Sequence, residues 1–280
     1  MMTVDQKKIK MELGEVQKTL LMPLWGRAKE YERGTPLIKD KYAFDLLNKL
    51  DYDFESISRS FNEYYQVYWA TRAYNIDCAI LKLLASSPDA TIINIGAGLD
   101  TTFQRVDNGR ITWYDLDLPD TIKLRKELIP ETERNLYIAK SVFDKSWFDE
   151  VKHSRSKIFF IASGVLCYFD KTSIQNLFSD LIDNFPESEI IFDLTSKIIV
   201  WLSNGEIAKK KEKLELSYLK WGGHSSKSIK KWSGKIEVID EYPLFSRIVI
   251  DKSCDKNTIT QIRQINTFKW IKMIQLKFNR

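Results

Sequence analysis

A short glycine-bearing loop between two apolar segments constrains the fold of this chain more than any other feature. Residues 91–95, Thr-Ile-Ile-Asn-Ile, lead directly into residues 96–98, Gly-Ala-Gly. A second apolar run, residues 111–116, brings two acids, Asp115 and Asp117. A glycine has no Cβ, so the backbone can pass close to a ligand. The arrangement predicts two adjacent parallel strands with a ligand at their carboxyl ends.

The segment after the glycines and the two acids indicate a cofactor that contains a nucleoside. We expect a helix to begin near Asp100 and to direct its free N–H groups at the ligand. Asp115 and Asp117 follow Gly96 by 19 and 21 residues, where a second strand would place a carboxylate beside a ribose. A dinucleotide fingerprint needs a third glycine where this chain has Thr101. S-adenosylmethionine, which has a ribose and an amino-acid tail but no phosphate, therefore fits better than NAD.

The composition is that of a soluble globular protein, and we expect it to be cytoplasmic. The chain has 280 residues, of which 44% are hydrophobic and 29% charged. No signal-peptide pattern or apolar run of membrane-spanning length is present in the sequence. The cysteines Cys78, Cys167 and Cys254 are scattered, and the only histidines are His153 and His224. We expect neither a disulfide framework nor a metal site.

The net charge of +5 is partly local, because lysines gather in residues 209–213 and 227–231. These lysines could attract an acidic partner. No aromatic platform for a single strand and no recognition-helix pattern accompanies them. We therefore interpret them as a solvated surface and expect neither a nucleic acid nor a membrane as partner. The oligomeric state is left open by the sequence.

Short apolar runs alternate with helical segments through the middle of the chain. Asp170 precedes the clearest helix, whose apolar residues recur at three- and four-residue steps until Pro186. This alternation predicts right-handed crossovers and a doubly wound α/β sheet. The expected strands are residues 91–95, 111–116, 136–140, 157–162 and 189–194.

We expect a single domain over residues 1–280. Its first part is a helical preface that includes a long helix from Asn62 to Ser86. Its last part contains strands at 235–241 and around 268–278, which would supply an antiparallel sheet edge. The four expected parts are the preface at 1–88, a cofactor-binding core at 89–195, a helical cap insertion at 196–234 and the late strands at 235–280.

Several sequence blocks together resemble the leucine carboxyl methyltransferase family, and within it the bacterial O-methyltransferases of polyketide biosynthesis of the tetracenomycin type. The pair formed by Gly-Ala-Gly-Leu-Asp-Thr and Asp-Leu-Asp-Leu-Pro is the most specific part of the resemblance. The late strands match only loosely. In family order the blocks are Thr19–Ala28, Pro36–Asp40, Arg72, Ile76-Asp77, Asn94–Thr102, Asp115–Pro119, Ser163–Tyr168, Phe185-Pro186 and Phe192-Asp193.

The resemblance implies a class I methyltransferase with a Rossmann-like, seven-stranded and mostly parallel sheet. The cofactor would be S-adenosylmethionine, and the product S-adenosylhomocysteine. On the family pattern Arg72 pairs with the methionyl carboxylate, and Asp117 takes the ribose hydroxyls. A guanidinium suits a carboxylate because it can form two parallel hydrogen bonds. The other implied cofactor-binding residues are Gly96, Ala97, Gly98, Leu118, Ser141, Val142 and Ser163.

Two positions depart from the family pattern. Ser163 stands where the family often has a glutamate near the amino-acid end of the cofactor. Ser141 stands at a position that is acidic in the protein-modifying relatives, which points towards the small-molecule branch. The sequence offers no decisive general base. Tyr168 is a candidate for orienting the acceptor, and His224, in the expected cap, is a more remote candidate.

The leading hypothesis is an O-methyltransferase that acts on a carboxylate or a hydroxyl of a small aromatic or polyketide-like molecule. The choice between the two acceptor groups stays open. One alternative is methylation of a protein's C-terminal carboxylate, which requires a groove for a peptide tail. Another is a regulatory protein that binds the cofactor without turnover. A dehydrogenase is disfavoured by Thr101.

Overall fold

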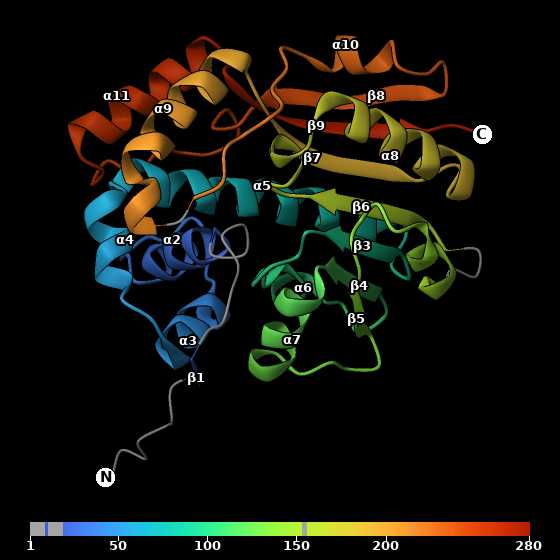
Figure 1. Cartoon of the computed structure of the whole chain (residues 1–280), viewed down its shortest axis with the longest axis horizontal. Helices are drawn as coiled ribbons and strands as arrows, with labels where there is room; N and C mark the ends of the chain where they lie inside the picture. Colours follow the sequence, from blue (N-terminus) through green and yellow to red (C-terminus); the bar gives the residue numbers. More distant parts are fainter. Residues whose placement is uncertain (1–8, 11–18, 153–155, 215) are drawn as a thin grey trace, which may run out of the picture.

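The computed structural model of the chain describes residues 9–10, 19–152, 156–214 and 216–280, and only the backbone at 9–10 and 210–214. Within these ranges a seven-stranded sheet forms the centre of the protein (Figure 1). Residues 1–8 and 11–18 of the expected helical preface, His153 and three of the lysine side chains in 209–213 lie outside the described part.

The strand order of the sheet is β5-β4-β3-β6-β7-β9-β8. The first five strands of this order are parallel, whereas β9 runs antiparallel to both β7 and β8. The predicted α/β fold with a mostly parallel sheet is thus confirmed, and the five predicted core strands agree with the structure to within one residue. The strands are β3 (Thr91–Ile95), β4 (Thr112–Asp117), β5 (Asn135–Ala139), β6 (Ile158–Ala162), β7 (Glu189–Thr195), β8 (Ile236–Pro243) and β9 (Ile271–Phe278).

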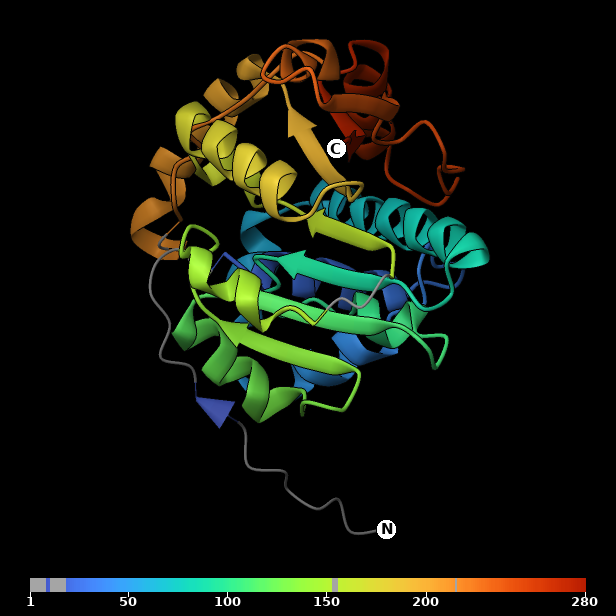
Figure 2. The ribbon, with the colours of Figure 1, turned by 90° about the vertical axis from the view of Figure 1, so that its right-hand side faces the viewer.

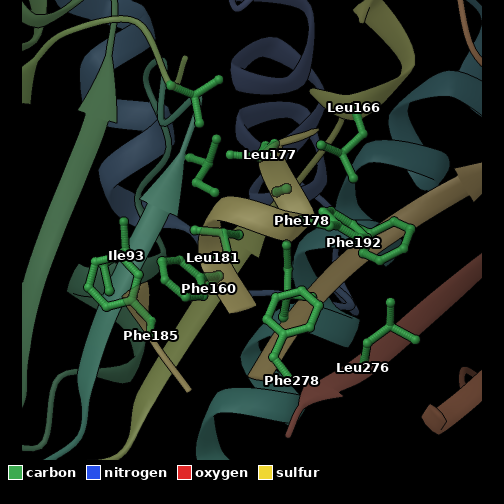
Figure 3. Close-up of a cluster of buried hydrophobic side chains, with 14 of the residues drawn as sticks. Ile93, Phe160, Leu166, Leu177, Phe178, Leu181, Phe185, Phe192, Leu276 and Phe278 are labelled. Atoms are coloured by element: carbon green, nitrogen blue, oxygen red, sulfur yellow. The ribbon is translucent and has the colours of Figure 1, made fainter. Parts of the chain in front are cut away.

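Side chains that alternate along β3 bury both faces of the sheet. Ile93 packs in a cluster with α8 (Lys171–Asn184), where Leu177, Phe178 and Leu181 lie near Phe160 of β6 and Phe192 of β7 (Figure 3). Ile92 instead belongs to a cluster with α5 (Glu63–Ser86) and α11 (Lys256–Thr267). A strand buried on both faces reads as a continuous apolar run, which is why it was visible in the sequence.

Helices from distant parts of the chain gather where β3 and β6 end (Figures 1 and 2). A third apolar cluster packs side chains of the first three helices of the described chain against α7, the helix Pro119–Leu128. In the described residues no helix combines the length and the apolar character needed to cross a bilayer. The remaining elements are β1 (Ile9–Lys10), α2 (Leu21–Tyr31), α3 (Lys41–Lys49), β2 (Leu50–Asp51), α4 (Phe54–Ser60), α6 (Thr102–Val106), α7 (Pro119–Leu128), η1 (Lys145–Glu150), η2 (Leu166–Tyr168), α9 (Lys197–Leu214) and α10 (Ser226–Lys230).

The late part of the chain contains a helix that the sequence analysis did not predict. The two late strands pair directly and form the expected antiparallel edge, but the chain forms the helix α11 between the end of the first strand and the start of the second. Its apolar face consists of Ile259, Ile262 and Ile265, and β-branched residues favour strands more than helices. Asp255 caps its N-terminus, and Lys269, with φ of 53°, follows its end. The strand predicted around 268–278 therefore begins only at Ile271.

Candidate functional site

The predicted site residues lie on the wall of one cavity of about 250 Å³. We call it the cofactor cavity. Gly96 follows β3, Asp117 ends β4, Ser141 follows β5 and Ser163 follows β6, and these strands are parallel neighbours. Their carboxyl ends therefore meet at one edge of the sheet. The predicted residues in its wall are Arg72, Gly96, Ala97, Gly98, Asp117, Leu118, Ser141, Val142, Ser163 and Tyr168.

The loop after β3 requires glycine for two reasons. Gly96 and Gly98 have φ of 64° and 51°, in the left-handed region that disfavours other residues. A Cβ at Gly96 would also overlap the side chain of Val165. The amide of Gly96 donates a 2.8 Å hydrogen bond to the carbonyl of Leu116, which holds the loop against β4. The glycine pattern thus reflects close packing within the protein as well as access for a ligand.

The carboxylate of Asp117 is held by two backbone amides. Its Oδ2 accepts a 2.7 Å hydrogen bond from Gly98, and its Oδ1 accepts one of 2.7 Å from Leu118. Burial raises the pKa of this carboxyl above its ordinary value, although the two amides act in the opposite direction. Each carboxylate oxygen has further acceptor capacity. The side chain is therefore fixed in the cavity wall and is able to accept hydrogen bonds from a vicinal diol.

Asp115 has a different role from Asp117. Its side chain is fully buried and pairs with Arg125, whose Nη2 lies 2.7 Å from Oδ2. It also accepts hydrogen bonds from Asn94, Trp113 and Asn135. Asp115 is not part of the cavity wall and acts as a buried hub that joins three strands.

An ionic cluster that the sequence analysis did not predict connects the end of the glycine loop to the helices that precede the sheet. The Oδ2 atom of Asp40 lies 3.0 Å from Nε of Arg27 and 2.6 Å from Nη1 of Arg105, and it accepts a 2.6 Å hydrogen bond from the hydroxyl of Thr101. Arg105 also pairs with Asp77 at 2.7 Å. Thr101 therefore uses the third-glycine position for a buried hydrogen bond. The sequence signal that could have indicated this cluster was a charged residue in each of three family blocks, namely Arg27 in 19–28, Asp40 in 36–40 and Asp77 in 76–77.

The predicted helix after the loop is short and begins later than expected. α6 starts at Thr102, and the carboxylate of Asp100 accepts hydrogen bonds from both the amide and the hydroxyl of Thr102. Burial would raise the pKa of Asp100, but the charges of Arg27 and Arg105 outweigh it and lower that pKa. The expectation that free N–H groups point at a ligand is thus wrong for the Thr102 amide. A cavity wall that contains Asp100 and Asp117 also disfavours a pyrophosphate.

Arg72 lies between the cofactor cavity and a second cavity. Its Nη1 is 3.6 Å from Oδ2 of Asp193, and its guanidinium lies 5.5 Å from the ring centroid of Tyr68. Burial would lower the pKa of Arg72, but the charge of Asp193 acts in the opposite direction, and the pKa is raised. A Cβ at Gly164, which has φ of 67°, would overlap the guanidinium. Arg72 is thus a buried, permanently charged group packed against a glycine.

The second cavity has a volume of about 690 Å³. We call it the acceptor cavity. Residues of α5, α9 and α11 form much of its wall, and many of the side chains are aromatic. Its aromatic residues are Phe61, Tyr64, Tyr65, Tyr68, Trp69, Tyr168 and Trp270, and the residues that it shares with the cofactor cavity are Thr19, Met22, Trp69, Arg72, Gly164 and Tyr168.

The two candidates for contact with the acceptor lie in different places. Tyr168, in the turn η2, belongs to the wall that the two cavities share. Burial raises the pKa of its phenol well above the ordinary value, so the phenol stays neutral and can donate a hydrogen bond. His224 is exposed and lines neither cavity.

The strand order, with its antiparallel strand between β7 and β8, and the cavity at the carboxyl ends define a class I methyltransferase fold. A candidate methyltransferase from Thermobifida fusca has this fold, with a TM-score of 0.59 at 11% identity over 95% of this chain and 96% of its own. A protein of the DUF574 family from Streptomyces avermitilis superimposes with a TM-score of 0.56 at 12% identity, over 91% and 97% of the two chains. Within this class the chain belongs to the leucine carboxyl methyltransferase family, whose model matches residues 20–182.

Two curated relatives extend the comparison. The chain is 31% identical over 179 residues to the tetracenomycin polyketide synthesis O-methyltransferase TcmP of Streptomyces glaucescens, which covers 64% of this chain and 65% of the relative. This match spans slightly less than two thirds of that protein. The chain is also 28% identical over 220 residues to the S-adenosyl-L-methionine-dependent methyltransferase dpfgK of Gibberella zeae, over 72% and 73% of the two chains. The family resemblance seen in the sequence is thus confirmed.

Proposed function

We propose that this protein is an S-adenosylmethionine-dependent O-methyltransferase with a small aromatic or polyketide-like acceptor. One observation carries the proposal: the cavity that gathers the predicted cofactor-binding residues shares a wall with a larger cavity rich in aromatic side chains. In the first cavity Arg72 is suited to the methionyl carboxylate and Asp117 to the ribose diol. Leu118 and Val142 supply apolar surfaces for the adenine, beside Ser141.

The bound cofactor would supply a methyl group on a positively charged sulfur, which an acceptor oxygen attacks from the side opposite the sulfur. The chain contributes mainly position. The shared wall, with Trp69 and Tyr168, holds the acceptor next to the cofactor cavity and excludes water. The neutral phenol of Tyr168 donates a hydrogen bond that orients the acceptor. Ser163 offers a hydroxyl at the amino-acid end of the cofactor.

The name of one relative supports an aromatic or polyketide-like acceptor, since TcmP is a polyketide synthesis O-methyltransferase. The aromatic lining of the acceptor cavity supports it as well, because planar ring systems pack well against aromatic side chains. A peptide tail would instead be read largely through its backbone, by hydrogen bonds along a groove. We place the reaction in the cytoplasm, where free thiols such as those of Cys78, Cys167 and Cys254 persist.

Titration calorimetry with S-adenosylmethionine, S-adenosylhomocysteine and NAD tests the cofactor. We expect binding of the first two and none of NAD, and binding of NAD alone would overturn the proposal. Release of S-adenosylhomocysteine in the presence of phenols or aromatic acids tests the activity. Turnover only with a peptide that ends in a free carboxylate would favour the protein-modifying alternative. Cofactor binding without turnover of any acceptor would favour a regulatory role.

A further inference from the structure

The helix α5 forms a wall of the acceptor cavity and shows in which direction that cavity extends. Trp69 and Arg72 of this helix line both cavities, and we call the wall that the cavities share the passage. Tyr64, Tyr65 and Tyr68, which lie nearer to the start of the helix, line only the acceptor cavity. The acceptor cavity therefore extends from the passage towards the start of α5.

Tyr64 lies at the end of this wall that is remote from the passage. It precedes Arg72 by eight residues, and a rise of about 1.5 Å per residue places their backbones about 12 Å apart along the helix axis. Its ring stacks on that of Tyr68 with a centroid distance of 6.2 Å, and the guanidinium of Arg72 lies over the ring of Tyr68. An acceptor that lies along α5 with its reacting oxygen at the passage would have its other end beside Tyr64.

The hydroxyl of Tyr64 is a polar group without a partner in the described part of the chain. The residue is only 9% exposed, and its ring packs in an apolar cluster with Ile262 and Ile265 of α11. No described residue forms a hydrogen bond with the hydroxyl. Burial raises the pKa of the phenol well above its ordinary value, so the hydroxyl stays neutral and can donate as well as accept. A buried group of this kind is unfavourable unless water or a ligand completes its hydrogen bonds.

Gln261 is a second unpaired polar side chain in the wall of the same cavity. It lies in the first half of α11, and its Oε1 is buried without a hydrogen-bond partner among the described residues. The amide of Asp255, which caps α11, donates a 2.7 Å hydrogen bond to Glu63, the first residue of α5. The two helices therefore begin side by side, at the end of the cavity where Tyr64 lies. Rotation about the last side-chain bond of Gln261 turns either its oxygen or its NH₂ group to the cavity.

The buried polar groups at this end of the cavity are uncharged. Among the described residues of the whole wall, the charged side chains are Arg59, Arg72, Asp193 and Glu206. Arg72 and Asp193 face each other at the passage, with 3.6 Å between Nη1 and Oδ2, whereas Arg59 and Glu206 are exposed. An ion at the remote end would lose its hydration without gaining a buried counter-charge. A carbonyl or hydroxyl oxygen needs only the hydrogen bonds that a phenol and an amide supply.

We infer that Tyr64 and Gln261 form a polar subsite for an uncharged oxygen substituent at the end of the acceptor remote from the methylated group, an inference that rests on the proposed function. The subsite is compatible with methylation of a carboxylate and of a hydroxyl, because it lies away from the reacting oxygen. It narrows the substrate class to elongated, planar ring systems that carry a carbonyl or a hydroxyl about two helical turns from that oxygen. The rings of Tyr65, Tyr68 and Trp69 supply the surface against which the acceptor packs.

Matched pairs of linear tricyclic probes test this subsite. One pair is an anthracene carboxylic acid and the same acid with a hydroxyl on the ring at the opposite end. The other pair is an anthrol and the diol with its second hydroxyl on the opposite end ring, so both possible reacting groups are covered. Quenching of tryptophan fluorescence measures binding, since Trp69 and Trp270 line the cavity. In the native protein the added hydroxyl should raise the affinity by about fivefold, because it completes a buried hydrogen bond.

Tyr64→Phe and Gln261→Met should each remove most of this gain and leave the affinity for the unsubstituted probes within about twofold of the native value. A purely structural role of either side chain would instead weaken both members of a pair equally. Tyr42→Phe and Gln104→Met are the matched controls and should keep the native gain. Tyr42 is 55% exposed, and Gln104 also has a buried unpaired side-chain oxygen, but neither residue lines either cavity.

Three results would overturn the inference. The native protein could bind none of the probes, it could show no gain from the added hydroxyl, or the gain could survive both Tyr64→Phe and Gln261→Met. If one variant does not fold, the other variant and the native pairs still decide. Failure of the proposed function gives a different result, because the native protein would then bind no S-adenosylmethionine in the calorimeter. Intact cofactor affinity and turnover with an unchanged gain in both variants would refute the subsite alone.

Discussion

The hydroxyl of Thr101 donates a 2.6 Å hydrogen bond to Asp40, which lies 61 residues earlier in the chain. Arg27 reinforces the link, because it pairs with Asp40 and also donates a 2.9 Å hydrogen bond to the carbonyl of Leu99. The helices before the sheet therefore hold the loop that forms one wall of the cofactor cavity. This link explains in physical terms why a threonine occupies the position of a third glycine.

Thr101→Val should destabilise the protein and weaken cofactor binding. Valine has nearly the shape of threonine but cannot donate to Asp40, and a buried acceptor that loses a donor costs about 1–3 kcal/mol. The free energy of unfolding in urea measures the loss, and calorimetry measures the affinity for S-adenosylmethionine. Thr172→Val, at an exposed position of α8, is the control and should change stability by less than about 0.5 kcal/mol. Equal stability of the two variants would contradict the role of Thr101.

Substitution of the two acids of β4 should separate binding from stability. Asp117→Asn should lower the affinity for S-adenosylmethionine by about tenfold or more, because a charged acceptor for the ribose diol is lost. It should cost only about 1–3 kcal/mol of stability, because one of the two backbone amides that donate to the carboxylate would lose its acceptor. Asp115→Asn should instead cost about 3–5 kcal/mol of stability, because Arg125 would be left as an uncompensated buried charge. Calorimetry and urea unfolding of both variants check the contrast, which a reversed pattern would refute.

Cofactor affinity should fall at acid pH through the protonation of Asp117. Burial raises the pKa of this carboxyl above 3.8, its value in the unfolded chain. In the pH window between these two pKa values the folded protein therefore binds more protons than the unfolded chain. Ionisation of Asp117 therefore costs stability as the pH rises through the window. A ribose diol favours the ionised form, so affinity is highest above the raised pKa and declines as the pH falls through it. Calorimetry between pH 7 and pH 4 should show a steeper decline in the native protein than in Asp117→Asn.

The sheet and the wall of the cofactor cavity could be predicted because their signals are local. Strands such as Thr91–Ile95 are apolar on both faces, and α8 repeats its apolar residues with a helical period. Because the carboxyl ends of parallel strands meet, the residues that follow β3, β4, β5 and β6 had to lie close together. The topology of the sheet therefore places four positions that are far apart in the sequence at one site.

The long-range contacts that hold the site residues in place could not be predicted in the same way. The contacts of Asp40 with Arg105 and of Asp193 with Gly164 join residues 65 and 29 positions apart, and no periodic pattern encodes such pairs. Phe192-Asp193 was visible as a family block, but its place at the passage depends on how α5 packs over the sheet. The helix α11 was missed for a local reason, because its few apolar residues are β-branched and its other residues are polar.

Gly164→Ala should disturb the wall between the two cavities. The residue has φ of 67°, which disfavours any side chain, and a Cβ there would overlap the guanidinium of Arg72. Arg72 must then move away from Asp193, so we expect about tenfold weaker binding of S-adenosylmethionine and a loss of about 1–2 kcal/mol of stability. Gly34→Ala is the matched control, since no atom lies within 4 Å of its added Cβ and its φ is not in the left-handed region. Calorimetry should show native affinity for Gly34→Ala, and an equally high affinity for Gly164→Ala would mean that Arg72 does not hold the cofactor.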